Sequence, residues 1–151
     1  MTTDLLLAIA HHLLAFSIVA FLFVEFVLVS AAWSPGRVVV LSRVDAGFDG
    51  SAMLILIVGF LRVFLGIKPE EFYLESPFFW AKIGALLLMG IVSIAPTLRF
   101  LRWAKYARAD PSFLPAPAEL ATVRRFIVLE AVIFLFIPTF AAVMARGYGL
   151  G

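Results

Sequence analysis

The first apolar stretch of the chain contains three ionisable side chains, which are rare in such a setting. The stretch reads LLLAIAHHLLAFSIVAFLFVEFVLVS and carries His11, His12 and Glu25. A charge at the centre of a bilayer costs at least about 2.5 to 3.5 kcal/mol. Such residues are therefore expected to face other helices, to pair with each other or to bind a ligand. A neutral imidazole can ligate a metal through one ring nitrogen, so the histidines are candidate metal or haem ligands.

Other ionisable residues lie within or beside the later apolar stretches. The basic ones are Arg62 and Lys82, and the acidic ones are Asp49 and Glu130. An arginine can hold a carboxylate with two parallel hydrogen bonds, and a neutral lysine amine can coordinate a metal or transfer a proton. Ligand binding and proton transfer are therefore the chemistry that these residue types suggest.

The composition of the chain is that of an integral membrane protein. Hydrophobic residues make up 64% of its 151 residues, against about 45 to 50% in a soluble domain. Cysteine is absent, which excludes disulfides, iron–sulfur ligation, covalent c-type haem attachment and thiolate-ligated haem. The net charge of +2 comes from arginines that flank apolar stretches, as topology signals do. We therefore expect the lipid bilayer, and no nucleic acid, as a partner.

Four apolar stretches are each long enough for a helix that crosses a bilayer, which needs about 20 residues. They cover about residues 5–32, 47–67, 78–98 and 123–145. The sequence therefore predicts an all-α fold, an integral membrane four-helix bundle that forms a single transmembrane domain over residues 1–151. Ser76 and Pro77 suit the N-cap and first position of the third helix. A basic cytoplasmic loop over 99–122 begins as a continuation of that helix and then turns through three prolines.

Lysine and arginine are distributed unevenly over the three connections. The first connection holds Arg37 and Arg43, the third holds six Lys and Arg residues, and the second holds Lys68 with three glutamates. Cytoplasmic loops carry an excess of Lys and Arg. We therefore expect a multi-pass protein of the bacterial inner membrane, with the first and third connections in the cytoplasm and both termini in the periplasm. Arg146, near the C-terminus, is the one residue that favours the opposite orientation.

The depth of each basic residue follows from a helical rise of 1.5 Å per residue. His11 and His12 lie about 9 to 10 Å inside the periplasmic end of the first span, Arg62 about 7 Å inside that of the second and Lys82 about 6 Å inside that of the third. We expect these four side chains to form one layer, the histidine layer. Snorkelling to the membrane surface is the alternative for Arg62 and Lys82.

Glu25, Asp49 and Glu130 lie at matching depths on the cytoplasmic side and form a second layer, the acidic layer. We expect their carboxylates to pair with Arg43 and Arg99 and so to hold the bundle in register. A proton path or a ligand pocket is the alternative. Because the two layers lie in opposite halves of the membrane, they are expected to have separate roles.

Adjacent histidines cannot share one direction on a helix. His11 and His12 point about 100° apart, and Glu25 lies within about 40° of His11 but about 220° from His12. We expect only one histidine to face a given site. A structural network would include His11 and leave His12 free as a ligand, although a hydrogen bond between helices is also a common role for a histidine in a span.

Short motifs in all four spans match a known pattern. These are HLL at 12–14, Arg43 followed ten positions later by Met53, WAK at 80–82 and LEA at 129–131. The pattern resembles the HemJ-type protoporphyrinogen IX oxidases, which are small bacterial inner-membrane proteins that bind b-type haem. It is also similar to a family of predicted bacterial membrane proteins of unknown function. The resemblance covers most of the transmembrane part of the chain.

The resemblance implies which residues hold a haem. In HemJ-type proteins a histidine of the first helix and a lysine of the third are tied to the haem, and these roles fall on His12 of HLL and Lys82 of WAK as iron ligands. His11 has no counterpart in the pattern and is a neighbour of the site. The chain departs from the pattern in having Glu25 in place of a basic residue and in adding Arg62, which suits a haem propionate.

The sequence thus predicts a haem b protein that acts in redox chemistry or electron transfer, with a haem-dependent oxidoreductase as the enzyme class that the resemblance implies. The rival is a cofactor-free accessory subunit whose polar layers are structural and which packs into a homo-oligomer or a larger membrane complex. A transporter fits less well, because no helix is broken by Gly and Pro at the midplane in paired positions.

The predicted orientation can be tested with a reporter that is active only in the cytoplasm. Fused after Gly151 it should be inactive, and inserted near Ala116 it should be active, because the basic connections stay in the cytoplasm. Reporter activity is measured in cells and normalised to expression. The opposite pattern would place the histidine layer toward the cytoplasm.

Overall fold

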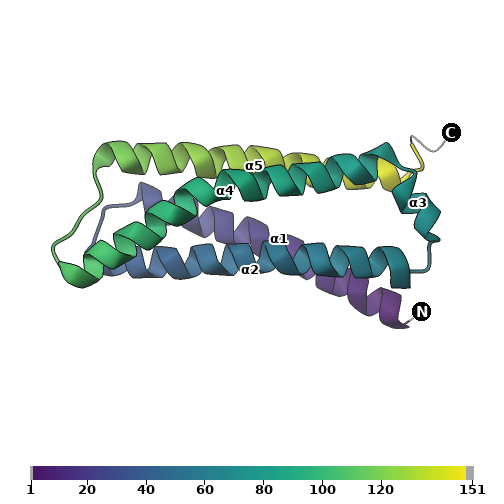
Figure 1. The fold of residues 1–151 in the computed structure, drawn as a ribbon, viewed down its shortest axis with the longest axis horizontal. Coiled ribbons are helices and arrows are strands. Elements are labelled where there is room, and N and C mark those ends of the chain that lie inside the picture. The colour runs from purple at the N-terminus through teal and green to yellow at the C-terminus, as the bar shows by residue number, and fades with distance from the viewer. Residues whose placement is uncertain (1, 149–151) are drawn as a thin grey trace.

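The chain forms four long helices that pack as a bundle (Figure 1). The computed structural model describes residues 2–148, so residue 1 and residues 149–151 of the predicted domain lie outside it. The helices are α1 (Thr2–Ser30), α2 (Pro35–Leu65), the short α3 (Glu70–Leu74), α4 (Pro77–Ala109) and α5 (Pro117–Ala145). Each long helix is long and apolar enough to cross a membrane. The predicted fold class is confirmed.

The bundle consists of two antiparallel hairpins, α1 with α2 and α4 with α5. The hairpins meet where α2 packs on α4 and α1 packs on α5. Both described chain ends lie at the same end of the bundle as α3, which we call the terminal end (Figure 1). The connections at 31–34 and 110–116 lie at the opposite end, the basic end.

The second helix begins earlier than predicted. It starts at Pro35, not near residue 47, so Arg37 and Arg43 belong to a helix rather than to a loop. The prediction was wrong because it required an apolar stretch, whereas helical hydrogen bonds form equally within a polar one. A proline in the first turn fits this start, since its fixed φ suits a helix and its missing N–H has no intrahelical partner there.

The basic loop is shorter than predicted. Residues 99–109 continue α4, as expected for its basic extension, but α5 already begins at Pro117, so that the connection covers only 110–116. Asp110 starts the turn by accepting hydrogen bonds from the hydroxyl and the backbone N–H of Ser112, at 2.6 and 2.8 Å. These two bonds lower the pKa of the Asp110 carboxyl, the hydroxyl bond having the larger effect. The turn is thus fixed by local polar contacts.

The third span begins where the sequence indicated. Ser76 is the N-cap of α4 and Pro77 is its first residue. The Ser76 hydroxyl makes no capping hydrogen bond, however, and is buried without a partner. Proline at the first position therefore defines this helix start more than the serine side chain does.

Two hydrophobic clusters of unequal size form the core. The larger cluster lies in the middle and basic end of the bundle and takes residues from all four long helices, with Trp103, Phe48, Phe100 and Ile18 among its fully buried members. The smaller cluster, built on Val63, Phe79 and Met144, lies at the terminal end and packs against Phe72 and Tyr73 at α3. The bundle interior is therefore divided into two apolar parts.

The hairpin of α1 and α2 is held by a close approach between Gly47 and Phe21. A Cβ atom at position 47 would lie 2.6 Å from the Phe21 Cζ atom, which is closer than real Cβ contacts. The absence of a side chain at Gly47 therefore lets the Phe21 ring lie against the backbone of α2.

Leucine substitutions at two helical glycines should separate this packing effect from helix propensity. Both Gly47→Leu and Gly84→Leu gain propensity, but a Cβ at Gly84 would meet nothing within 4 Å. We expect Gly47→Leu to have a free energy of unfolding about 1 to 3 kcal/mol below that of Gly84→Leu. Thermal unfolding of both variants in one detergent measures the difference. Equal stabilities would mean that the Phe21 ring moves aside without cost.

Candidate functional site

A cavity between the two hairpins is lined by all four residues of the histidine layer. It has an inner chamber of about 160 Å³ and, toward the terminal end, an outer chamber of about 300 Å³. Both chambers are lined by His11, His12, Gly59, Phe79, Lys82 and Ala141. Each of the four long helices contributes at least one of these residues. We call the two chambers together the histidine cavity.

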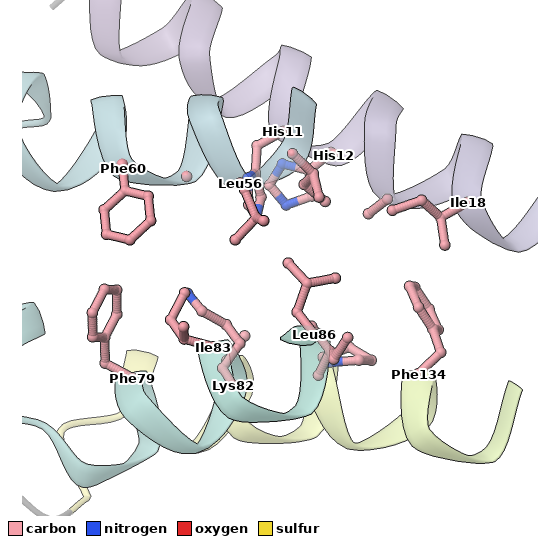
Figure 2. Close-up of a pocket in the computed structure, with 16 residues that line it drawn as sticks. His11, His12, Ile18, Leu56, Phe60, Phe79, Lys82, Ile83, Leu86 and Phe134 are labelled. Atoms are coloured by element: carbon pink, nitrogen blue, oxygen red, sulfur yellow. The ribbon is translucent and has the colours of Figure 1, made fainter. Parts of the chain in front are cut away.

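The two hairpins supply opposite walls of the inner chamber (Figure 2). The side chains of His11 and His12 lie on the wall formed by α1 and α2, and that of Lys82 lies on the facing wall formed by α4 and α5. The labelled apolar side chains around them are Ile18, Leu56, Phe60, Phe79, Ile83, Leu86 and Phe134. The inner chamber is thus an apolar space with basic groups on both sides.

The hydrogen bond of His12 determines which of its ring nitrogens is free. Its Nδ1 atom lies 2.7 Å from the carbonyl oxygen of Ala8, one helical turn earlier. A carbonyl oxygen can only accept, so Nδ1 carries the proton and donates. In the neutral ring the lone pair is then on Nε2. Histidines that ligate metals are commonly fixed in this way, with the second nitrogen donating to a carbonyl or carboxylate.

His11 lies deeper and packs against α2. Its Nδ1 atom is buried without a hydrogen-bond partner, and a Cβ at Gly59 would lie 3.9 Å from that atom. The His11 and His12 rings stand nearly perpendicular, at 85°, with centroids 6.3 Å apart. Both histidines line both chambers, so the expectation that only one would face the site was wrong. The cavity extends far enough around α1 to be lined by both side chains, although they leave the helix in different directions.

Lys82 and Arg62 approach the cavity from different helices. Lys82 is half-buried, and its Nζ atom lies 5.1 Å from the centroid of the Phe79 ring, within the range of a cation–π contact. Arg62 lines the outer chamber only, and its Nε atom is buried without a partner. Neither side chain extends away from the bundle, so both are available to a ligand in the cavity.

A further basic residue, which the sequence analysis did not identify as part of the site, lines the outer chamber. Lys68 lines this chamber, and its Nζ atom lies 3.7 Å from the centroid of the Phe72 ring. Phe72 and Tyr73 of α3 also line it. In the sequence, Lys68 is the only basic residue of its short connection and is followed by the aromatic pair Phe72 and Tyr73. This pattern does not predict that α3 folds back over the cavity.

The acidic layer differs from its prediction in composition. Glu25 and Glu130 are buried as expected, each with 1% of its surface exposed, but Asp49 is exposed. Asp45, one helical turn earlier, is buried instead with 3% exposed and accepts a 2.9 Å hydrogen bond from the Thr97 hydroxyl. The prediction missed Asp45 because it placed this part of α2 in a loop.

The predicted pairing of this layer with arginines is not what the structure shows. Arg99 donates to the carbonyl oxygen of Ala95 and lies 5.7 Å from the centroid of the Phe126 ring, while Arg43 is exposed. One carboxylate oxygen each of Glu25 and Glu130 is buried without a partner. Arg43 stands two positions from the buried Leu41 and Asp45, so α2 directs it away from the core.

Comparison with known proteins gives one match, to a family. Residues 3–149 match the family described as "Predicted membrane protein (DUF2214)". The chain belongs to this family. No curated protein and no solved structure matches this DUF2214 protein. The match confirms that the chain belongs to a family of predicted membrane proteins, as one of the two resemblances in the sequence indicated. The resemblance to HemJ-type oxidases stays a prediction.

Glu130→Gln tests whether the DUF2214 protein needs a charge in its acidic layer. Glutamine keeps the size and hydrogen-bonding capacity but removes a carboxylate that has no observed cationic partner. A neutral amide carries no cost of burying a charge, so the midpoint of thermal unfolding in detergent should stay level or rise. A fall of several degrees would show that the carboxyl group of Glu130 makes a stabilising contact that an amide cannot replace.

Proposed function

We propose that this DUF2214 protein binds a b-type haem in the histidine cavity and uses it in redox chemistry or electron transfer in a bacterial inner membrane. The observation that supports this most strongly is the position of His12 and Lys82 on opposite walls of one apolar cavity. The two residues that the HemJ-type resemblance ties to haem therefore line the same space, although they are 70 positions apart in the sequence.

The nitrogen atoms of these residues fit an iron centre. With Nδ1 of His12 donating to Ala8, its Nε2 lone pair is free for a metal. Within residues 2–148 no three His, Cys, Asp or Glu side chains group as ligands of a metal ion. A haem needs only one or two ligands from the protein, so His12, with Lys82 opposite, suffices for haem where it would not for a bare ion.

The charge of the cavity also favours haem. The basic side chains that line both chambers are His11, His12 and Lys82, and the outer chamber adds Arg62 and Lys68. Among residues 2–148, no carboxylate side chain lines either chamber. Basic groups in an apolar cavity suit a ligand that combines a large apolar body with negative charge. Haem is such a ligand, because its macrocycle is apolar and its two propionates are anionic.

The positions of the basic residues suggest how the haem would be oriented. Arg62 and Lys68 line only the outer chamber, so they would hold the propionates at the terminal end. The buried Nε atom of Arg62, which has no hydrogen-bond partner within residues 2–148, could then donate to a carboxylate as part of a two-bond contact. Phe60 and Phe79 would cover the ring and exclude water.

A bound haem supplies a couple between ferric and ferrous iron. The chain's own contribution would be His12 and Lys82 as the residues that hold the iron, and Phe60 and Phe79 as apolar walls. The amine of Lys82 could serve as a ligand or carry a proton. In the orientation predicted from the loop charges, the cavity lies in the periplasmic half of the membrane.

Substitution of the two histidines distinguishes a ligand from a neighbour. His12→Ala should abolish bound haem, and His11→Ala should retain most of it, because only His12 has a free nitrogen fixed by a backbone hydrogen bond. The measurement is haem per folded chain, from the absorption spectrum and protein concentration after purification. His11→Ala is the matched control, since the two side chains line the same cavity.

Lysine 82 gives a second test that does not depend on the histidines. Lys82→Ala should shift the haem spectrum or weaken binding, and Lys82→Arg should not restore it, because a guanidinium stays protonated and has no lone pair to offer. If His12→Ala, Lys82→Ala and Lys82→Arg all keep the wild-type spectrum, the haem is bound outside the histidine cavity and the proposal fails.

A further inference from the structure

A second concave site lies at the basic end, far along α4 from the histidine cavity. It is a groove of about 430 Å³ between the end of α4 and the start of α5. Leu98, Arg99 and Arg102 line it from α4, and Glu119 and Thr122 line it from α5. The proposed haem function makes no use of this groove.

The two arginines differ in how they are held. Arg99 is half-buried, with one guanidinium nitrogen donating to the carbonyl oxygen of Ala95 at 3.0 Å and its charged group 5.7 Å from the centroid of the Phe126 ring. These contacts fix its position and use few of its five N–H donors. Arg102, one turn further along α4, is exposed. The groove therefore has one guanidinium held by contacts within the bundle and one that is exposed.

The acidic residue of the groove is engaged elsewhere. Glu119 accepts a 3.1 Å hydrogen bond from the indole N–H of Trp103, which is itself buried in the core. This bond holds the carboxylate of Glu119 toward α4 and ties the start of α5 to the end of α4. Glu119 contributes one negative charge to the groove, and Arg99 and Arg102 contribute two positive charges, so the ionisable side chains of the lining carry a net positive charge.

Apolar residues of α4 lie next to the two arginines of the groove. No charged residue occurs between Lys82 and Arg99, so Arg99 is the first cation after an uninterrupted uncharged segment of α4. Leu98 and Leu101, beside the arginines, are 57% and 56% exposed. A phospholipid has a matching arrangement, because its anionic phosphodiester lies directly next to its acyl chains. The arginines would contact the phosphodiester, and the exposed leucines would contact the acyl chains. Basic pockets at the ends of membrane helices commonly bind the headgroups of anionic lipids.

We propose that the groove between α4 and α5 binds the headgroup of an anionic phospholipid, with the phosphodiester on Arg99 and Arg102 and an acyl chain along Leu98. The lipid would hold the two helices together at the end of the bundle opposite the histidine cavity. This inference does not rest on haem binding. It holds for either orientation of the chain in the membrane.

Native mass spectrometry of the full chain in detergent, titrated with phosphatidylglycerol or phosphatidylcholine, tests the proposal. Arg99→Gln with Arg102→Gln should weaken the apparent affinity for phosphatidylglycerol by about thirtyfold, at about 1 kcal/mol for each arginine. The matched control is Arg124→Gln with Arg125→Gln, two exposed arginines that do not line the groove. It removes the same charge from outside the groove and should therefore weaken the affinity less than the groove variant does.

The single variant Arg102→Gln keeps the test valid if the double variant does not fold. Arg102 is exposed, so its loss leaves the core intact and should weaken phosphatidylglycerol binding by about fivefold. Equal losses in the groove and control variants would overturn the proposal, because binding would then follow surface charge alone. Unchanged affinity in Arg102→Gln, or displacement of the lipid by millimolar inorganic phosphate, would also overturn it.

Discussion

The structure depends on how ionisable side chains are accommodated inside an apolar bundle. A charged group at membrane depth is stable only when it faces the protein interior, where it can pair, bind a ligand or lose its charge. This constraint directs His11 and Lys82 inward from opposite hairpins and brings Glu25 and Glu130 into the core. The hairpins therefore cannot pack as uniform apolar surfaces. The carboxylates lie among residues of the larger apolar cluster, and the histidine cavity lies toward the smaller one.

The two polar regions solve this problem differently. At the terminal end, basic groups line an open cavity, and α3 lies over its outer chamber. Nearer the basic end, carboxylates are packed among core residues, and Asp45 is partnered by the Thr97 hydroxyl. An open, basic, apolar cavity is suited to an anionic ligand. Among the buried carboxylates, Asp45 links α2 to α4 through its hydrogen bond with Thr97. The basic cavity and the buried carboxylates thus occupy different parts of the bundle.

Much of the candidate site could be predicted from the sequence, because depth follows from position along a helix. A constant rise of 1.5 Å per residue placed Lys82 and Arg62 beside the histidines, and the structure brings them to one cavity. The helix starts could not be predicted from apolar stretches alone. With α2 begun at Pro35, the buried positions Val38, Leu41, Asp45 and Phe48 follow a spacing of three and four. Asp45 could then have been identified in place of Asp49, whereas the contact of α3 with the cavity depends on tertiary packing.

The central claim is that the histidine cavity holds a haem, and the absorption spectrum of the unmodified protein tests it most directly. The protein is purified in mild detergent after expression with sufficient haem supply, and bound haem is quantified by extraction. The account predicts a Soret band whose wavelength differs between the oxidised and the reduced protein, with about one haem per chain. A colourless protein that gains no Soret band when haem is added would contradict the account. The cofactor-free accessory subunit would then be the function to pursue.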